Sequence, residues 1–153
     1  MPSDSTVFVD TNVLLYAQDP RVPDKQARAA AWVAHCWRQG CGRLSTQVLN
    51  ELYVNLRRTA PQLDLAEGRA LVRCYRAWQP WVVDGSTVDL AWELQDRFAL
   101  SYWDALMVAA AQQLGCRFLL TEDLQHGQQV DRLQILNPFL VGTEVLDAPL
   151  PSP

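Results

Sequence analysis

Short apolar runs alternate along this chain with longer segments in which apolar residues recur every three or four positions. The runs at 6–9, 117–120 and 133–136 contain branched and aromatic residues, and this composition predicts buried strands. Residues 81–83 predict a further strand, and residues 43–44 form either a short strand or a connector. The strand signals are therefore brief and widely separated.

Helical periodicity fills the intervals between these strands. Prolines, glycines and hydroxyl residues mark the expected ends, with Ser45 or Thr46 and Ser86 or Thr87 as candidate caps, and Ser101 opening the last helix. The expected helices begin at residue 13 and then cover 25–39, 47–58, 64–78, 86–98 and 101–114.

Strands that alternate with helices need crossover connections, which favour a parallel sheet covered on both faces. We therefore predict an α/β fold, a three-layer α/β/α sandwich with a short parallel sheet. We expect one domain over residues 1–140 and a Pro-rich tail over 141–153, with the chain loosely held from residue 137 onward. Ligands in such folds gather at the carboxyl ends of the strands.

The composition and charge of the chain exclude several classes of protein. Of 153 residues, 49% are hydrophobic and 20% charged, as in an ordinary globular protein. The net charge of −4 argues against a protein that coats duplex DNA. The longest apolar run, 105–111, is too short to span a membrane, and the first residues lack a secretory pattern, so we expect a cytoplasmic protein.

Four acidic residues stand where a site would form. Asp10 follows the first strand and Asp123 follows the strand at 117–120, while Glu51 and Asp104 border apolar helix faces. Each also has an ordinary structural interpretation: Asp10 as a helix cap, Glu51 as a solvated side chain, Asp104 in a capping box with Ser101, and Asp123 as the cap of a turn.

Considered together, these carboxylates would meet at one rim and repel each other unless cations were present. Hard oxygen ligands suit Mg²⁺ or Mn²⁺, which can activate water against a phosphodiester. Such chemistry needs no lysine or histidine, and the chain has one lysine and two histidines. Its four cysteines form no CxxC pair, so a zinc site is poorly supported.

Four segments resemble the successive motifs of the PIN-domain family, and most of all its VapC-type toxins. They are FVDTNVLLYA (8–17), LSTQVLNELY (44–53), ALSYWDALMVAAA (99–111) and FLLTEDL (118–124). The resemblance covers about residues 6–136. It implies a PIN-like fold, a Mg²⁺-dependent endoribonuclease acting on RNA, a homodimer, and a cognate antitoxin protein as partner.

The resemblance also implies roles for individual residues. The family's acids correspond to Asp10, Glu51, Asp104 and Asp123, with Glu122 as the alternative for the fourth. The chain departs from the family where a second aspartate and an aromatic residue often follow, because here the sequence continues as LQHG (124–127). Asn12, Ser101 and Thr121 match polar positions that support the acids or the metal-bound water.

Two other functions stay open. The protein could be a catalytically silent PIN scaffold that only binds RNA or protein, or it could cleave DNA. Arg69, Arg73 and Arg76 recur at helical spacing, and form either a solvated face or a surface for RNA or an acidic partner. Trp103 stands out among the tryptophans because it adjoins Asp104.

Overall fold

Five strands form one sheet in the computed structural model, which describes residues 5–147. The strands are β1 (Val7–Val9), β2 (Gly42–Arg43), β3 (Phe118–Leu120), β4 (Gln129–Val130) and β5 (Leu133–Leu136). Their order is β2-β1-β3-β5-β4, and every neighbouring pair is parallel except β4 with β5. The sheet is therefore mostly parallel, with β1 and β3 at its centre.

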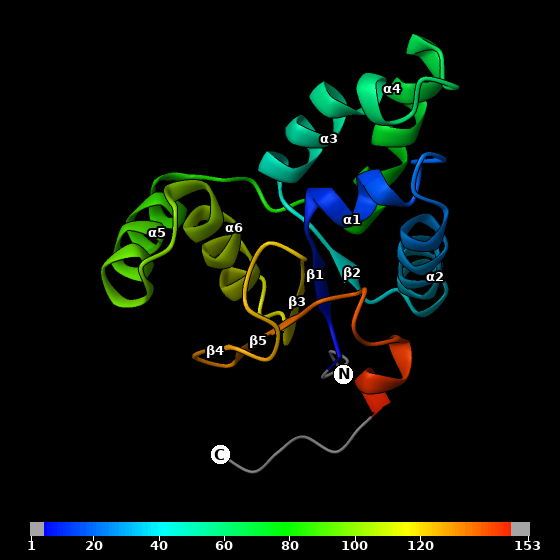
Figure 1. The fold of residues 1–153 in the computed structure, drawn as a ribbon. Coiled ribbons are helices and arrows are strands. Elements are labelled where there is room, and N and C mark those ends of the chain that lie inside the picture. The colour runs from blue at the N-terminus through cyan, green and yellow to red at the C-terminus, as the bar shows by residue number, and fades with distance from the viewer. Residues whose placement is uncertain (1–4, 148–153) are drawn as a thin grey trace.

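Helices cover the sheet on both sides (Figure 1). The helices are α1 (Thr11–Tyr16), α2 (Pro23–Gln39), α3 (Thr46–Thr59), α4 (Leu65–Cys74), α5 (Gly85–Phe98) and α6 (Tyr102–Gln113), with 3₁₀ turns η1 (Tyr75–Trp78) and η2 (Thr143–Asp147). The paired α5 and α6 lie on one side, and α1 and α2 lie on the other, with α3 packed against α1 and α4 beyond it. The predicted three-layer α/β/α sandwich is confirmed.

The core explains why the sequence forms these layers. Every residue of β1 and β3 is buried, as are residues 105–111 of α6, so the longest apolar run of the chain is a helix buried beneath the sheet. A helix that is apolar nearly all round needs neighbours on most of its surface. Here α5 packs against α6, and residues 105–111 share one hydrophobic core with β1 and β3. No helix within residues 5–147 has the length and apolar character needed to cross a membrane.

Two local predictions were wrong. Residues 81–83 are not a strand, because Trp81 forms only an isolated bridge with Ser45. Helix α5 is capped by Asp84 rather than by Ser86 or Thr87, since the Asp84 carboxylate accepts a hydrogen bond from the Thr87 backbone at 3.1 Å. The short antiparallel strand β4 was not predicted, because two residues carry no periodic signal.

The chain after β5 is held more firmly than predicted. The Trp32 indole of α2 donates a hydrogen bond to the Val141 carbonyl at 3.1 Å, and the Phe139 ring packs edge-on against Tyr16. The 3₁₀ turn η2 then lies against α2. The expected loose tail is therefore wrong for residues 137–147, and its remaining part, 148–153, lies outside the described residues.

A close approach fixes glycine in the edge strand β2. A Cβ atom built on Gly42 would lie 2.7 Å from the Trp78 ring, well inside contact distance. The ring cannot easily withdraw, because it is nearly buried and packs against Trp37 and Tyr75 at centroid distances of 5.1 and 4.9 Å. Glycine at this position therefore lets η1 pack onto the sheet edge.

We predict that Gly42→Ala lowers the free energy of unfolding by about 1–3 kcal/mol, the usual cost of overpacking. Gly85→Ala is the matched control, because a Cβ atom there meets nothing within 4 Å. Urea unfolding of the two variants measures the effect. Equal stability of the Gly42 and Gly85 variants would show that the aromatic cluster yields without cost.

Candidate active site

Asp10 ends β1 and caps α1, so its carboxylate stands at the carboxyl edge of the sheet. Its Oδ1 accepts a hydrogen bond from the Thr11 backbone at 2.6 Å, and its Oδ2 accepts one from the Thr121 hydroxyl at 2.7 Å. The residue is only 7% exposed. The helix-cap interpretation of Asp10 and the site interpretation are thus both compatible with this geometry.

This position raises the pKa of Asp10 from its usual 3.8 to about 7. Burial is the main cause, because it removes water from the charged form. The nearby carboxylates of Asp123 and Glu51 raise the pKa further, while the hydrogen bonds from Thr121 and Thr11 oppose the shift. The carboxylates of Asp123 and Glu51 therefore lie close enough to Asp10 to disfavour its charged form.

Glu51 reaches Asp10's neighbourhood from α3. The Thr11 hydroxyl donates to Glu51 Oε2 at 2.9 Å, and the Gln47 amide donates to Glu51 Oε1 at 3.1 Å. Thr11 and Gln47 were not identified from the sequence. The four-residue spacing of Gln47 and Glu51 on one helix face is the signal that could have revealed Gln47.

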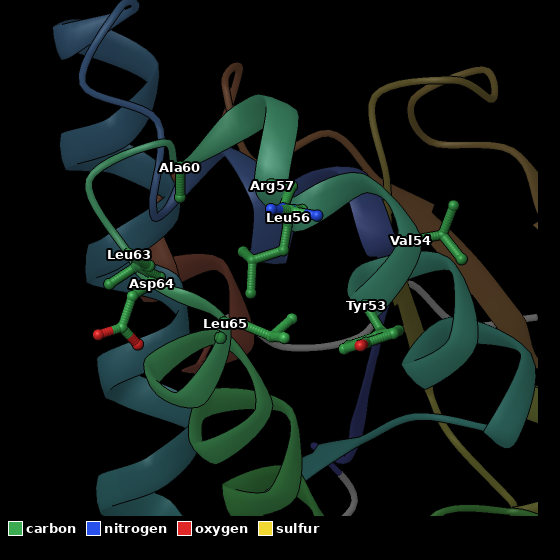
Figure 2. A pocket seen from close by; sticks show the side chains of 9 residues that line it. Tyr53, Val54, Leu56, Arg57, Ala60, Leu63, Asp64 and Leu65 are labelled. Carbon is green, nitrogen blue, oxygen red and sulfur yellow. The ribbon is translucent and has the colours of Figure 1, made fainter.

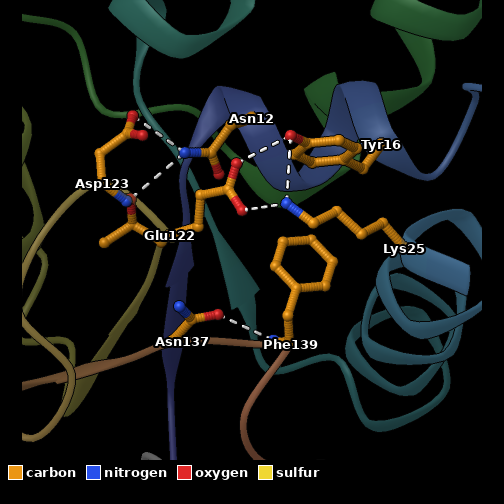
Figure 3. Close-up of polar contacts among 8 residues, drawn as sticks. Asn12, Tyr16, Lys25, Glu122, Asp123, Asn137 and Phe139 are labelled. Atoms are coloured by element: carbon orange, nitrogen blue, oxygen red, sulfur yellow. Dashed lines mark hydrogen bonds and ion pairs between the residues drawn. The ribbon is translucent and has the colours of Figure 1, made fainter. Parts of the chain in front are cut away.

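Asp123 joins the same network through the end of β3. Its backbone N–H donates to the Thr121 hydroxyl at 3.1 Å, and its Oδ2 accepts from the Asn12 amide at 3.0 Å (Figure 3). Thr121 is fully buried, so the hydroxyl that bonds Asp10 also positions the start of this turn. Within residues 5–147 the buried Asn12 Oδ1 has no hydrogen-bond donor, which leaves one acceptor available at the site.

Asp104 approaches from the first turn of α6. Its backbone N–H donates to the Ser101 hydroxyl at 3.2 Å, so Ser101 caps the helix as predicted. Burial raises the pKa of the Asp104 carboxyl, and the charges of Asp123 and Glu51 raise it further. Asp104 therefore lies within electrostatic reach of two of the other acids.

Glu122 points the other way. Its carboxylate pairs with the Lys25 ammonium at 2.7 Å and accepts a hydrogen bond from the Tyr16 hydroxyl at 2.8 Å (Figure 3). The ammonium also lies 4.9 Å from the centre of the Phe139 ring. Glu122 thus fastens the end of β3 to α1 and α2, while its neighbour Asp123 faces the Asn12 amide.

The acids suit a hard divalent cation in their chemistry. Asp10, Glu51, Asp104 and Asp123 offer only oxygen donors, and the unpartnered Asn12 Oδ1 adds a neutral one. Burial is the main cause of the raised pKa values of Asp10 and Asp104, and the neighbouring carboxylates add a repulsion that a cation would neutralise. As the side chains stand in residues 5–147, no three acidic, histidine or cysteine groups surround a common point.

Two further hollows open elsewhere on the surface, and one of them borders the network at Asn12. One has a volume of about 210 Å³ and is polar, with two acids and two arginines beside Asn12: Asp19, Glu122, Arg21 and Arg58. Arg21 is already paired with Asp19 at 2.9 Å, which leaves Arg58 as the arginine of this hollow with no acid paired to it in residues 5–147. Another, of about 200 Å³, lies between the end of α3 and the start of α4 and is mostly apolar (Figure 2). Of the predicted arginine stripe, Arg69 donates to the Tyr53 hydroxyl at the apolar hollow's edge at 3.2 Å.

Comparison with known proteins gives a family match. The PIN domain model matches residues 7–132, which is most of the chain. No match was found among curated proteins.

Three solved structures share the fold. A toxin–antitoxin complex from Klebsiella pneumoniae has a TM-score of 0.59 at 16% identity, covering 88% of this chain and 98% of that one. VapC20 of Mycobacterium tuberculosis, a toxin that cleaves the sarcin–ricin loop, has 0.56 at 19%, covering 74% and 87%. VapBC2 of Rickettsia felis, bound to a DNA fragment from its promoter, has 0.57 at 12%, covering 85% and 96%. At these identities the likeness concerns the fold.

The raised pKa of Asp10 predicts a pH-dependent stability. Between its usual pKa of 3.8 and about 7, the unfolded chain ionises at Asp10 while the folded chain keeps the proton. The stability that protonated Asp10 contributes is therefore complete below pH 3.8 and is lost as the pH rises toward 7. We expect Asp10→Asn, measured in EDTA, to raise the free energy of unfolding relative to the parent by about 2–3 kcal/mol more at pH 8 than at pH 4.

Thermal or urea unfolding at the two pH values measures this difference. Asp96→Asn on the exposed side of α5 is the control and should show no such pH dependence. If Asp10→Asn changed stability equally at both pH values, the carboxyl group would not be held in its protonated form.

Proposed function

Because the chain belongs to the PIN domain family, we propose that it is a Mg²⁺-dependent endoribonuclease, the toxin of a toxin–antitoxin pair. The structures that share its fold support this assignment, since they include toxin–antitoxin proteins and a toxin that cleaves the sarcin–ricin loop. The proposed reaction is hydrolysis of a phosphodiester bond in single-stranded or looped RNA.

One observation carries the proposal. Three carboxylates from segments far apart in sequence meet in one hydrogen-bonded network, because Thr11 joins Glu51 to the end of β1 and Thr121 joins Asp10 to the end of β3. Asn12 adds Asp123 to the network. A purely structural core would gain little from gathering like charges in a partly buried place, because their repulsion opposes folding.

In the proposed site, Asp10, Glu51, Asp104 and Asp123 hold Mg²⁺, or Mn²⁺ in its place, directly or through water. When bound, such an ion polarises a phosphate oxygen and makes water a stronger nucleophile. The chain itself fixes the acids: Thr121 and the α1 backbone orient Asp10, Asn12 orients Asp123, and Ser101 sets the first turn that carries Asp104.

The substrate class rests on local rather than overall charge. A net charge of −4 offers a nucleic acid little long-range attraction, so binding must rely on the ion and on nearby groups. Arg58 at the polar hollow beside Asn12 would contact a phosphate that flanks the cleaved bond, whereas Arg21 is already paired with Asp19. DNA cleavage and a silent scaffold are the competing functions, and the assay below, run on RNA and on DNA under the same Mg²⁺ conditions, distinguishes cleavage of RNA from cleavage of DNA.

The antitoxin and a second copy of the chain complete the proposal as partners. The apolar hollow between α3 and α4 supports a protein partner, because the exposed side chains of Tyr53, Val54 and Leu65 border it, with Arg57 and Asp64 at the rim (Figure 2). Such a surface can receive apolar side chains of a bound segment. A small protein encoded beside this chain that blocks its activity would support the toxin assignment.

The direct test is cleavage of total cellular RNA by the purified protein free of antitoxin. We expect discrete fragments with Mg²⁺, none with EDTA, and a loss of at least about 100-fold for Asp10→Asn or Asp104→Asn, because each removes a charge from the site. Asp96→Asn is the matched control. Cleavage of DNA alone would assign a deoxyribonuclease, and no cleavage by the folded protein with metal present would favour the silent scaffold or a substrate missing from that RNA pool.

The same assay decides the identity of the fourth acid. We expect Asp123→Asn to lose most cleavage, because its carboxylate faces the network, and Glu122→Gln to keep it. Glu122→Gln should instead lower the melting temperature, since Lys25 and Tyr16 lose their charged partner. Loss of cleavage in the folded Glu122→Gln variant would reverse the two assignments.

A further inference from the structure

A large aromatic side chain stands exposed beside the acidic network. Trp103 is 63% exposed and directly precedes Asp104 in the first turn of α6. Leaving an indole in water is costly, so a tryptophan in such a position calls for an explanation. Its solvent exposure contrasts with residues 105–111 of the same helix, which are all buried.

Trp103 is held in place rather than loosely presented. Its backbone carbonyl accepts a hydrogen bond from the Gln47 amide at 3.2 Å, and the same amide donates to Glu51. Its ring contacts the Tyr102 ring edge-on, at a centroid distance of 5.3 Å. One side chain of α3 therefore positions both an acid of the network and the backbone that carries the indole.

A hollow of about 430 Å³ lies next to this ring, between α3, the start of α6 and the loop before α5. This volume falls in the range of about 300–1,000 Å³ that is usual for small-ligand sites. Trp103, Leu106 and Val83 give the hollow an apolar wall, and Gln47, Asn50, Thr46 and Glu51 give it a polar one. Because Glu51 belongs to both, the hollow and the acidic network are continuous.

The lining selects the chemistry of the occupant. Among the residues that the structure describes, no arginine or lysine borders the hollow, and the Glu51 carboxylate would repel a phosphate there. A flat, neutral group with hydrogen-bonding edges fits instead, because it can stack on the indole and face the Asn50 amide. An unpaired nucleobase has these properties, and aromatic side chains are the usual platforms for unstacked bases of RNA.

We propose that Trp103 and this hollow bind one unstacked base of the RNA strand, next to the phosphodiester that the acids would cleave. The inference rests on the proposed ribonuclease function and adds to it a base subsite at a defined place. The subsite meets the acidic network at Glu51, and the polar hollow at Arg58 meets it at Asn12, so a bound strand would contact both hollows as it passes the acids. Specificity would then include the identity of the base that Asn50 faces.

The test is equilibrium binding of fluorescent single-stranded oligoribonucleotides, compared with an abasic oligomer of the same length, by anisotropy in Ca²⁺. We expect the parent protein to bind the base-bearing strands about tenfold more tightly than the abasic one. Trp103→Ala should remove this difference, and Trp103→Phe should restore part of it. Trp92→Ala, which removes an indole that is 56% exposed on α5, is the matched control and should retain the difference.

The possible results separate this inference from the function on which it rests. If Trp103→Ala and the parent preferred base-bearing over abasic strands to the same degree, the subsite would be overturned. The cleavage assay would still stand as separate evidence for a ribonuclease. A shift in sedimentation on Trp103→Ala, with discrimination unchanged, would overturn it in favour of a contact between copies of the chain. Discrimination without any cleavage would uphold the subsite and reject the ribonuclease, and absence of all RNA binding would reject both.

Discussion

The structure depends on a carboxyl group buried at the junction of β1 and α1. Asp10 must accept hydrogen bonds there, because a buried carboxylate without donors is costly. The fold supplies two donors, the α1 backbone and the Thr121 hydroxyl at the end of the neighbouring strand β3. Meeting this requirement fixes the register of the two central strands at their carboxyl ends, which is where the remaining acids gather.

The turn after β3 shows how adjacent residues divide two tasks. Glu122 pairs with Lys25, the chain's single lysine, and ties the sheet to α2. Asp123 turns toward Asn12 and the network. The ion pair is half-exposed, so its contribution to stability is about 1 kcal/mol at most. Its more important effect is orientation, since Glu122 held on one side of the turn directs Asp123 to the other.

The sequence predicted those parts of the fold whose signals are local and repeated. The PIN family, the layered architecture and the Ser101 cap were confirmed, because periodicity, capping residues and successive motifs all carry them. Residues 81–83 were misjudged since branched residues also occur in loops that pair only once with a strand edge. The loose tail was predicted from its prolines, and a proline-rich composition does not reveal a long-range contact such as the hydrogen bond from Trp32 to the Val141 carbonyl.

The site could be foreseen only in its residue types. The positions of the acids along the chain made them candidates. The sequence could not predict the long-range hydrogen bonds that orient them, such as the bond from Thr11 to Glu51 across 40 residues. Nor did it show that Gln47 binds Glu51 and the Trp103 backbone together. This last pairing has a consequence for evolution of the site. Any change at Gln47 would disturb an acid and the neighbouring hollow at once, so the proposed metal site and the proposed base subsite could not vary independently at that position.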